Sequence, residues 1–292
     1  MSRRQPLPDR RTSGSDGRLC GSRLTVPAGF GAAEVHSHTL ASDGMVFAED
    51  LVLVAADIGL NVLCITDHDT LGATPRAVEL GAELGVEVVA GQEVTTAMPP
   101  GSHVVGLFLE HPVRIGMSLE DTVDAIHDQG GLAILAHPFM PTWFASITPR
   151  RARRLLERRA VDGIELRHTC LVPPSTWSLA DRFYAEHRER LGAALGAGDS
   201  HFGAGDLGRM VSVFPGKSAQ EFRRAVESRR VSPLRGINPV GPSLWTRLRQ
   251  QRRSMLWLAA ERRAGRVGRG LGPVRLLSGG AERASGSSPP RR

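Results

Sequence analysis

Several features that would narrow the class of this protein are missing from its 292 residues. No apolar run approaches the ~18 residues that a membrane-spanning helix needs, so we expect no transmembrane segment. The first residues carry positive charge without a following apolar stretch, so we expect no secretion signal. The three cysteines, Cys20, Cys64 and Cys170, are odd in number and far apart. Such spacing indicates reduced thiols and a cytoplasmic location rather than a disulfide framework.

Positive charge is unevenly distributed along the chain. The formal net charge is +7. Residues 1–29 hold six arginines and two aspartates, and residues 237–292 hold twelve arginines and two glutamates, which leaves −7 for residues 30–236. An acidic middle suits a site that collects cations. We predict a disordered basic leader over 1–29, a globular barrel over 30–236, and a basic, partly helical or disordered tail over 237–292.

The middle of the chain alternates between short apolar runs and amphipathic runs, which is the pattern of repeated βα units. The expected strands cover 32–37, 61–66, 86–92, 103–109, 132–137, 162–167 and 192–198, and the expected helices lie near 47–59, 74–84, 118–129, 149–160, 176–189 and 218–229. Seven strands are one fewer than in the common eightfold barrel. The sequence therefore predicts an α/β fold with an irregular or open barrel, followed by a further helix within 243–264.

Histidines and carboxylates end the predicted strands. They are His36 and His38, Asp67 to Asp69, Glu93, His137, and Asp199 with His201. Alternate residues of a strand point the same way, so His36 and His38 can both face one mouth of a barrel. A single histidine at a strand end is more often structural, but five such strand ends together favour a centre for several divalent metal ions.

The order of the motifs carries a specific resemblance. The motifs are Glu34-Val35-His36-Ser37-His38 with Ser42-Asp43-Gly44, Ile65-Thr66-Asp67-His68-Asp69-Thr70, Gly91-Gln92-Glu93-Val94, His103-Val104-Val105-Gly106, Ala136-His137-Pro138-Phe139 and Gly198-Asp199-Ser200-His201. Together they resemble the motifs of the polymerase-and-histidinol-phosphatase (PHP) family over roughly residues 31–236. The stretch after residue 160 also resembles the C-terminal PHP-associated segment.

The resemblance implies a distorted (βα)7 barrel of the TIM type that holds two or three divalent ions, with Zn, Mn or Fe as the metal. The implied ligands are His36, His38 and Asp199 for the first ion, Glu93 between the first and second, His103 and His137 for the second, and Asp43, His68 and His201 for the third.

The activity implied is that of a metal-dependent phosphoesterase acting on a small phosphorylated metabolite or a nucleotide. Clustered dications neutralise phosphate oxygens and acidify a bound water, which then attacks phosphorus. Asp67, His68 and His201 are the candidate catalytic residues. Whether His201 or Asp67 governs the proton of the leaving group stays open at this point. No Gly-x-Ser-x-Gly elbow for a serine nucleophile is present.

Two other functions remain open. The same site could hydrolyse a carbamate or another carbonyl ester. Alternatively, the barrel could be a non-catalytic protein that binds nucleic acid, or an anionic surface, through its basic tail. Family members that degrade nucleotides usually insert a helical domain between the Glu93-like and His137-like motifs. Only residues 94–136 intervene here, so the mouth is expected to be more open.

Arg167 and His168 end another predicted strand, so at least one of them should reach the mouth. The functional interpretation is binding of a substrate phosphate or carboxylate, because the guanidinium fork fits two oxygens. The alternative is an ion pair between Arg167 and Glu165 or another residue of the barrel wall. For Asp69, we expect a capping role in the next turn rather than a water-mediated contact with the third ion.

Overall fold

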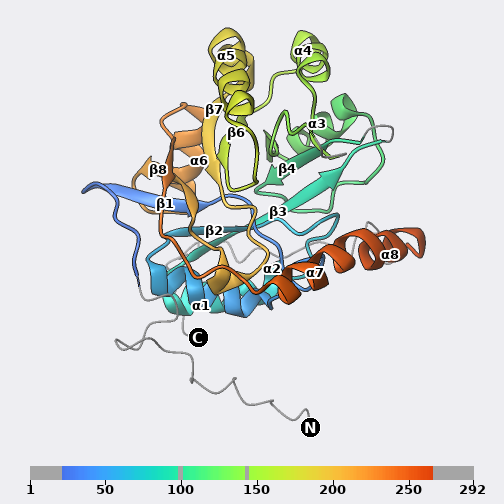
Figure 1. The fold of residues 1–292 in the computed structure, drawn as a ribbon. Coiled ribbons are helices and arrows are strands. Elements are labelled where there is room, and N and C mark those ends of the chain that lie inside the picture. The colour runs from blue at the N-terminus through green and yellow to red at the C-terminus, as the bar shows by residue number, and fades with distance from the viewer. Residues whose placement is uncertain (1–21, 98–100, 142–144, 266–292) are drawn as a thin grey trace, which may run out of the picture.

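The structure, a computed structural model, describes residues 22–97, 101–141 and 145–265 (Figure 1). Its described strands form one sheet in the order β7-β6-β5-β4-β3-β2-β1-β8-β9. Their bounds are β1 Phe30–Glu34, β2 Val62–Ile65, β3 Glu87–Thr95, β4 His103–Leu107, β5 Leu132–Leu135, β6 Gly163–His168, β7 Ala193–Ala197, β8 Met210–Pro215 and β9 Ser232–Arg235. The first three strands are parallel, as are β5 to β7, whereas β4 runs antiparallel to both of its neighbours.

The sheet curls into a nearly closed barrel, in which β7 meets β8 through the side chain of Ser212. The Ser212 hydroxyl of β8 accepts a hydrogen bond from Gly196 N of β7 at 3.0 Å and donates one to Gly196 O at 2.9 Å. A Cβ atom on Gly196 would contact the Val211 carbonyl oxygen and would lie 3.0 Å from Pro233 Cα of β9. Glycine is therefore needed where the ends of the sheet approach each other.

The helices lie around this barrel. They are α1 Ala48–Ile58, α2 Thr74–Leu84, α3 Leu119–His127, α4 Pro149–Arg158, α5 Pro174–Leu191 and α6 Ala219–Glu227. Local sequence sets several of their ends. Ser118 caps α3 by accepting from Asp121 N at 3.0 Å. At α6 the Ser218 hydroxyl accepts from Glu221 N and the Glu221 carboxylate accepts from Ser218 N, which makes a capping box.

Alternate residues of β2 pack in two different clusters of the core. In β2, Val62 and Cys64 pack in the cluster that contains Phe214 and Phe222, whereas Leu63 and Ile65 pack in the cluster of α1. Phe222 of α6 is fully buried, with its ring 5.2 Å from that of Phe214. Because both faces of β2 are covered, the strand is a continuous apolar run.

The sequence predicted the α/β barrel, and the structure confirms it, with all seven expected strands and all six expected helices present. It missed β8 and β9. β9 contains Pro233, and none of its residues is buried as those of β2 are, because Ser232 and Arg235 are exposed and the two residues between them are half-buried. Antiparallel pairing of β8 with both β1 and β9 adds these two strands to the expected set.

Both ends of the described chain contact the barrel. Leu24 N donates to Ile58 O at 2.8 Å, and Leu24 and Val26 pack against the cluster of α1. The helix expected within 243–264 is confirmed as α7 Leu244–Arg252, a π-helical turn Arg253–Leu258 and α8 Ala259–Arg263. Residues 1–21 of the predicted leader and 266–292 of the predicted tail lie outside the described residues. None of the described helices is long and apolar enough to cross a membrane.

Candidate metal centre

Nine histidines and carboxylates converge at one mouth of the barrel. His36 and His38 follow β1, Asp43 precedes α1, His68 follows β2, Glu93 lies in β3, His103 begins β4, His137 follows β5, and Asp199 and His201 follow β7. His103 fits this arrangement because β4 is antiparallel to β3, so its first residue lies at the same mouth as the end of β3. Residues far apart in the sequence thus share one site.

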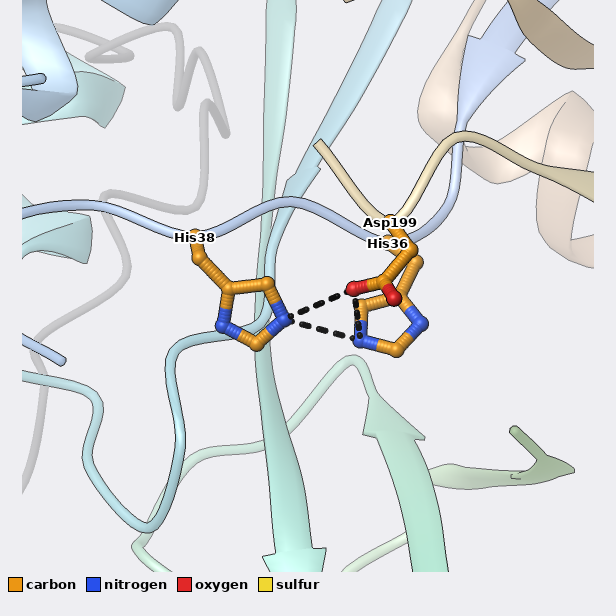
Figure 2. Close-up of side chains that lie close together, drawn as sticks. All are labelled: His36, His38 and Asp199. Atoms are coloured by element: carbon orange, nitrogen blue, oxygen red, sulfur yellow. Dashed lines mark hydrogen bonds and ion pairs between the residues drawn. The ribbon is translucent and has the colours of Figure 1, made fainter. Parts of the chain in front are cut away.

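The first group contains His36, His38 and Asp199, whose side chains point toward one another (Figure 2). The Nε2 atoms of the two histidines are 3.0 Å apart. Asp199 Oδ1 lies 3.5 Å from His36 Nε2 and 3.3 Å from His38 Nε2. All three atoms therefore face one small volume.

Glu93 lies between this group and a second one. Its Oε1 atom is 2.5 Å from His103 Nδ1 and 3.0 Å from His137 Nε2. Its Oε2 atom is 3.1 Å from His36 Nε2, 3.3 Å from His38 Nε2 and 3.1 Å from His68 Nδ1. Because each oxygen faces a different set of imidazoles, one carboxylate can serve two adjacent cation positions.

Asp43 is the centre of a third group. Its Oδ1 atom lies 3.3 Å from His201 Nε2, 3.6 Å from His38 Nδ1 and 3.7 Å from His68 Nε2. His201 Nδ1 lies 2.9 Å from Asp199 O. A carbonyl oxygen only accepts, so Nδ1 carries a hydrogen and Nε2 is the ring nitrogen that faces Asp43.

The residues present fit divalent metal ions. Several buried atoms of the centre make no well-aligned hydrogen bond to any described residue, namely Asp43 Oδ1, His68 Nδ1, His103 Nδ1 and His137 Nδ1. Buried polar groups without partners are costly unless an ion or water satisfies them. The donor atoms within each of four groups lie within 4.8 Å of one another. Nitrogen and oxygen ligands of this kind suit Zn, Mn or Fe.

Electrostatics keep the carboxylates of the centre ionised. Burial acts to raise the pKa of Glu93, but His103, His68 and His36 outweigh burial and hold the pKa well below its usual value. Burial likewise acts to raise the pKa of Asp199. His36, His201 and His38 outweigh burial and hold this pKa well below its ordinary value. Ionised carboxylates are the form that binds cations, and binding also requires the neighbouring imidazoles to be neutral.

Strained backbone aims two of these side chains. His137 has φ 25° and Asp199 has φ 48°, so both non-glycine residues lie in the left-handed region. Such conformations cost of order 1–3 kcal/mol and cluster at functional sites. At both positions the chain has just left a strand, and the unusual turn directs the side chain into the mouth.

Buried carboxylates behind the mouth hold the ligands in place, and the sequence interpretation missed their role. Glu165 Oε1 lies 2.7 Å from His36 Nδ1, and Glu165 Oε2 accepts from His137 N at 2.7 Å. Asp206 accepts from His201 N at 2.7 Å. The available signal for Glu165 was a lone carboxylate inside the apolar run of β6, which the sequence interpretation treated only as a partner for Arg167.

Glu34 supports the exit of β7 in the same way. It accepts from Gly198 N at 2.7 Å, and a Cβ atom on Gly198 would contact Glu34 Oε2. Burial raises the pKa of Glu34 to about 8. Close packing of Glu34 against glycine therefore positions the turn that carries Asp199.

Asp67 lies behind the loop that carries Asp43. Its Oδ1 atom accepts from Thr39 N at 2.7 Å and from the Ser42 hydroxyl at 2.6 Å, and its Oδ2 atom accepts from the Thr39 hydroxyl at 2.7 Å. The sequence interpretation grouped Asp67 with the catalytic residues. With three donors on its carboxylate, Asp67 holds the loop 39–43, and its catalytic role stays a prediction.

Arg167 and His168 diverge because the register of β6 against β7 shifts between Glu165 and Arg167. Such a bulge re-aims the side chains that follow it. Arg167 pairs with Asp181 of α5 at 2.9 Å, and its guanidinium lies 5.6 Å from the centre of the Trp177 ring. The structure therefore shows an ion pair with the wall, with Asp181 as the partner rather than Glu165.

His168 is buried, and its ring lies 4.6 Å from that of Trp177. Neither ring nitrogen has a hydrogen-bond partner among the described residues. Burial lowers the pKa of His168 to about 4, against the opposing effect of Glu165. A neutral imidazole with two unpaired nitrogens is thus available beside the centre.

The structure does not show the capping role that the sequence predicted for Asp69. Its carboxylate accepts from Thr95 N at 2.8 Å and from Arg262 Nε at 2.6 Å. The helix that follows, α2, has Ala73 at its N-cap without a side-chain cap. Asp69 therefore links the ends of β2 and β3 to the C-terminal helices.

Comparisons with known proteins agree with this geometry. The PHP domain model matches residues 34–157. An uncharacterized protein of Methanocaldococcus jannaschii is 36% identical over 120 residues, which cover 37% of this chain and 68% of that protein. A 5'-3' exoribonuclease of Salmonella typhimurium is 31% identical over 152 residues, or 51% of this chain and 42% of that protein. This chain belongs to the PHP domain family, although it spans less than half of that exoribonuclease.

Solved structures share the fold. A two-domain protein of Bacteroides vulgatus, containing a predicted PHP-like metal-dependent phosphoesterase, aligns with a TM-score of 0.60 and 21% identity over 73% of this chain and 68% of that chain. An amidohydrolase of Chromobacterium violaceum aligns with a TM-score of 0.51 and 19% identity over 70% of this chain and 97% of that chain. At these identities the likeness concerns the barrel.

Proposed function

We propose that this protein is a metal-dependent phosphoesterase that cleaves a phosphomonoester or a nucleotide phosphate. The observation that carries the proposal is the convergence of four ligand groups around Glu93 and His38 at one barrel mouth. The similarity to exoribonucleases, whose substrates are phosphodiesters, supports phosphate ester hydrolysis over other reactions.

The proposal keeps the ligand sets expected from the sequence. The first two sets correspond to groups in the structure, whereas Asp43 and His201 are grouped there with His38, and His68 with His38 and Glu93. His36, His38 and Asp199 would hold one divalent ion, Glu93 with His103 and His137 a second, and Asp43, His68 and His201 a third, with Zn, Mn or Fe as the metal. When bound, these ions would neutralise phosphate oxygens and lower the pKa of a bound water.

The protein's own groups prepare this chemistry. Glu165 orients His36 through Nδ1, so that Nε2 faces the mouth. The backbone carbonyl of Asp199 does the same for His201. Such partners fix the tautomer and ring orientation of histidine ligands. His168, with both nitrogens unpaired, is the residue we propose to hydrogen-bond the substrate, whereas Arg167 is already engaged by Asp181.

The proposed substrate is a small phosphorylated metabolite or a nucleotide, and the proposed location is the cytoplasm. The free thiols of Cys64 and Cys170 support a reducing compartment. Contact of the basic tail, residues 237–292, with nucleic acid or an anionic surface stays a prediction.

The test is a hydrolysis screen combined with elemental analysis. The purified chain, loaded with Mn or Zn, is offered phosphorylated metabolites, dinucleotides, p-nitrophenyl phosphate and naphthyl carbamate. Hydrolysis of a phosphate ester by the wild type and by the control His111→Ala, which alters an exposed histidine, but not by His36→Ala, supports the proposal. Cleavage of the carbamate alone would assign carbonyl-ester hydrolysis instead. Full metal content with no hydrolysis would contradict both.

A further inference from the structure

The C-terminal segment, defined here as residues 244–263, reaches the metal centre. It follows β9 and comprises α7, the π-helical turn and α8 (Figure 1). Gln250 of α7 is buried and donates from Nε2 to Asp43 Oδ2 at 3.2 Å, although the two residues are 207 positions apart in the chain. A residue outside the barrel thus contacts one of the candidate metal ligands directly.

We propose that Gln250 is a positioning residue that completes the third metal site, an inference that rests on the proposed function. The two oxygens of Asp43 have different environments. Oδ1 faces the rings of His201, His38 and His68 and makes no well-aligned hydrogen bond within the described part of the chain, whereas Oδ2 accepts from Gln250. The hydrogen bond to Oδ2 restricts rotation of the carboxylate and keeps Oδ1 directed at the imidazoles.

The choice of an amide matters for the charge of the site. An amide donates a hydrogen bond without a positive charge, so Gln250 orients Asp43 and leaves its negative charge for a cation. A lysine or arginine in that position would neutralise the ligand. Partners of this kind around a ligating carboxylate typically change metal affinity by about 10- to 100-fold.

Arg253 fixes the backbone of the same loop. It donates from Nε to Ser42 O at 2.7 Å and from Nη2 to Leu40 O at 2.6 Å. Its guanidinium lies 3.8 Å from the centre of the Trp257 ring, which belongs to the same segment. Asp67 holds the loop from the barrel side and Arg253 holds it from the other, so Asp43 is placed between two anchors.

The far end of the segment is anchored at the mouth as well. Arg262 donates from Nε to Asp69 Oδ2 at 2.6 Å and from Nη2 to Thr95 Oγ1 at 2.7 Å. Arg253 and Arg262 therefore attach the segment on the C-terminal side of Gln250 at two points. In contrast, Glu165 and Glu34, which support the first and second groups, belong to the barrel itself.

This contrast predicts a selective defect. Loss of the Gln250 side chain should weaken the third site and leave the first two sites intact. We would measure the number of bound Mn ions by equilibrium dialysis with elemental analysis, and their dissociation constants by calorimetry. The full chain is compared as wild type, Gln250→Leu, Gln250→Met and Asp43→Asn, with Met255→Ala as an exposed control on the same segment.

The expected result is that Asp43→Asn loses one ion and that Gln250→Leu binds that ion about 10- to 100-fold more weakly. Gln250→Met keeps the length of the side chain but removes the donor without adding charge, so it should show the same loss and serves where Gln250→Leu fails to fold. Met255→Ala should bind as the wild type does.

The outcomes separate the inference from the proposed function. A wild type that binds no divalent ion would end both. If the wild type binds its ions and Asp43→Asn loses one, but both Gln250 variants retain every ion at wild-type affinity, the inference alone is wrong. Equal loss in Met255→Ala would also overturn it, because the segment would then act through general packing.

Discussion

Glu165 and His36 are joined across the barrel, with Glu165 Oε1 2.7 Å from His36 Nδ1 and both side chains fully buried. The contact leaves His36 Nε2 facing His38, Glu93 and Asp199. A carboxylate in this position sets the tautomer of a histidine and raises its basicity as a ligand. The orientation of the first ligand group therefore depends on a residue of β6 that itself does not face the cation position.

The Glu165→Gln variant tests this relationship. The amide has nearly the same shape, but it lacks the charge that favours a hydrogen on Nδ1. We expect affinity for the ion of the first group to fall by about 10- to 100-fold with the fold preserved. Calorimetric titration with Mn measures the change, and circular dichroism checks the fold. Unchanged affinity in a folded variant would remove Glu165 from the set of positioning residues.

Removal of metal should destabilise the protein. Without cations the mouth keeps several buried carboxylates and imidazoles close together. A ligand that binds only the native state adds about 2.7 kcal/mol at a free concentration 100 times its Kd. We expect a chelator to lower the thermal transition of the wild type and to leave that of Glu93→Gln much less affected. Identical shifts in the two proteins would show that the chelator acts elsewhere.

Loss of Glu93 should affect more than one ion. Its Oε1 atom faces His103 and His137, and its Oε2 atom faces His36 and His68. We expect Glu93→Gln to retain at least one ion fewer than His137→Ala, which removes a ligand from one group only. Elemental analysis of both variants at the same free Mn concentration compares them. Equal metal content would argue against a shared carboxylate.

Closure of the barrel should depend on Gly196. A Cβ atom there would contact the Val211 carbonyl oxygen of β8 and Pro233 of β9. Overpacking of this kind typically costs about 1–3 kcal/mol. We expect Gly196→Ala to lower the free energy of unfolding by that amount in urea. Gly241→Ala is the control, since its added atom would meet only the flexible side chain of Arg247. A stable Gly196→Ala variant would mean that the strands separate without cost.

The pair His127 and Asp162 should give a pH-dependent contribution to stability. The hydrogen bond from His127 Nε2 to Asp162 Oδ2, 2.8 Å long, raises the pKa of His127 against the effect of burial. A raised pKa in the folded state stabilises the protein at low pH, and this contribution is lost as the pH rises through the folded value. The contribution is therefore complete below about pH 6.5, the ordinary histidine value.

Urea unfolding of the wild type and of His127→Gln checks the sign of this effect. We expect the difference in free energy of unfolding to be larger at pH 6 than at pH 9, while the metal centre contributes equally to both proteins. A difference that grows with pH would contradict the assignment.

The sequence by itself determined seven of the nine described strands and the candidate ligands at their ends. The apolar runs of β2 and β5 have the length and composition of buried strands, and a histidine lies shortly after the end of each run. The strand ends and their histidines could therefore be predicted from the local sequence. The motif order then placed His36, Glu93, His137 and Asp199 in one site.

Only the tertiary structure decided which groups hold those ligands. Glu165, Asp67 and Gln250 act on residues 129, 25 and 207 positions away, through hydrogen bonds to His36, Ser42 and Asp43. Local patterns carry no record of such contacts, because their partners become neighbours only when the barrel closes and the C-terminal segment packs against it. The same reason explains Arg167, whose direction was set by a register shift between two strands rather than by its own place in the sequence.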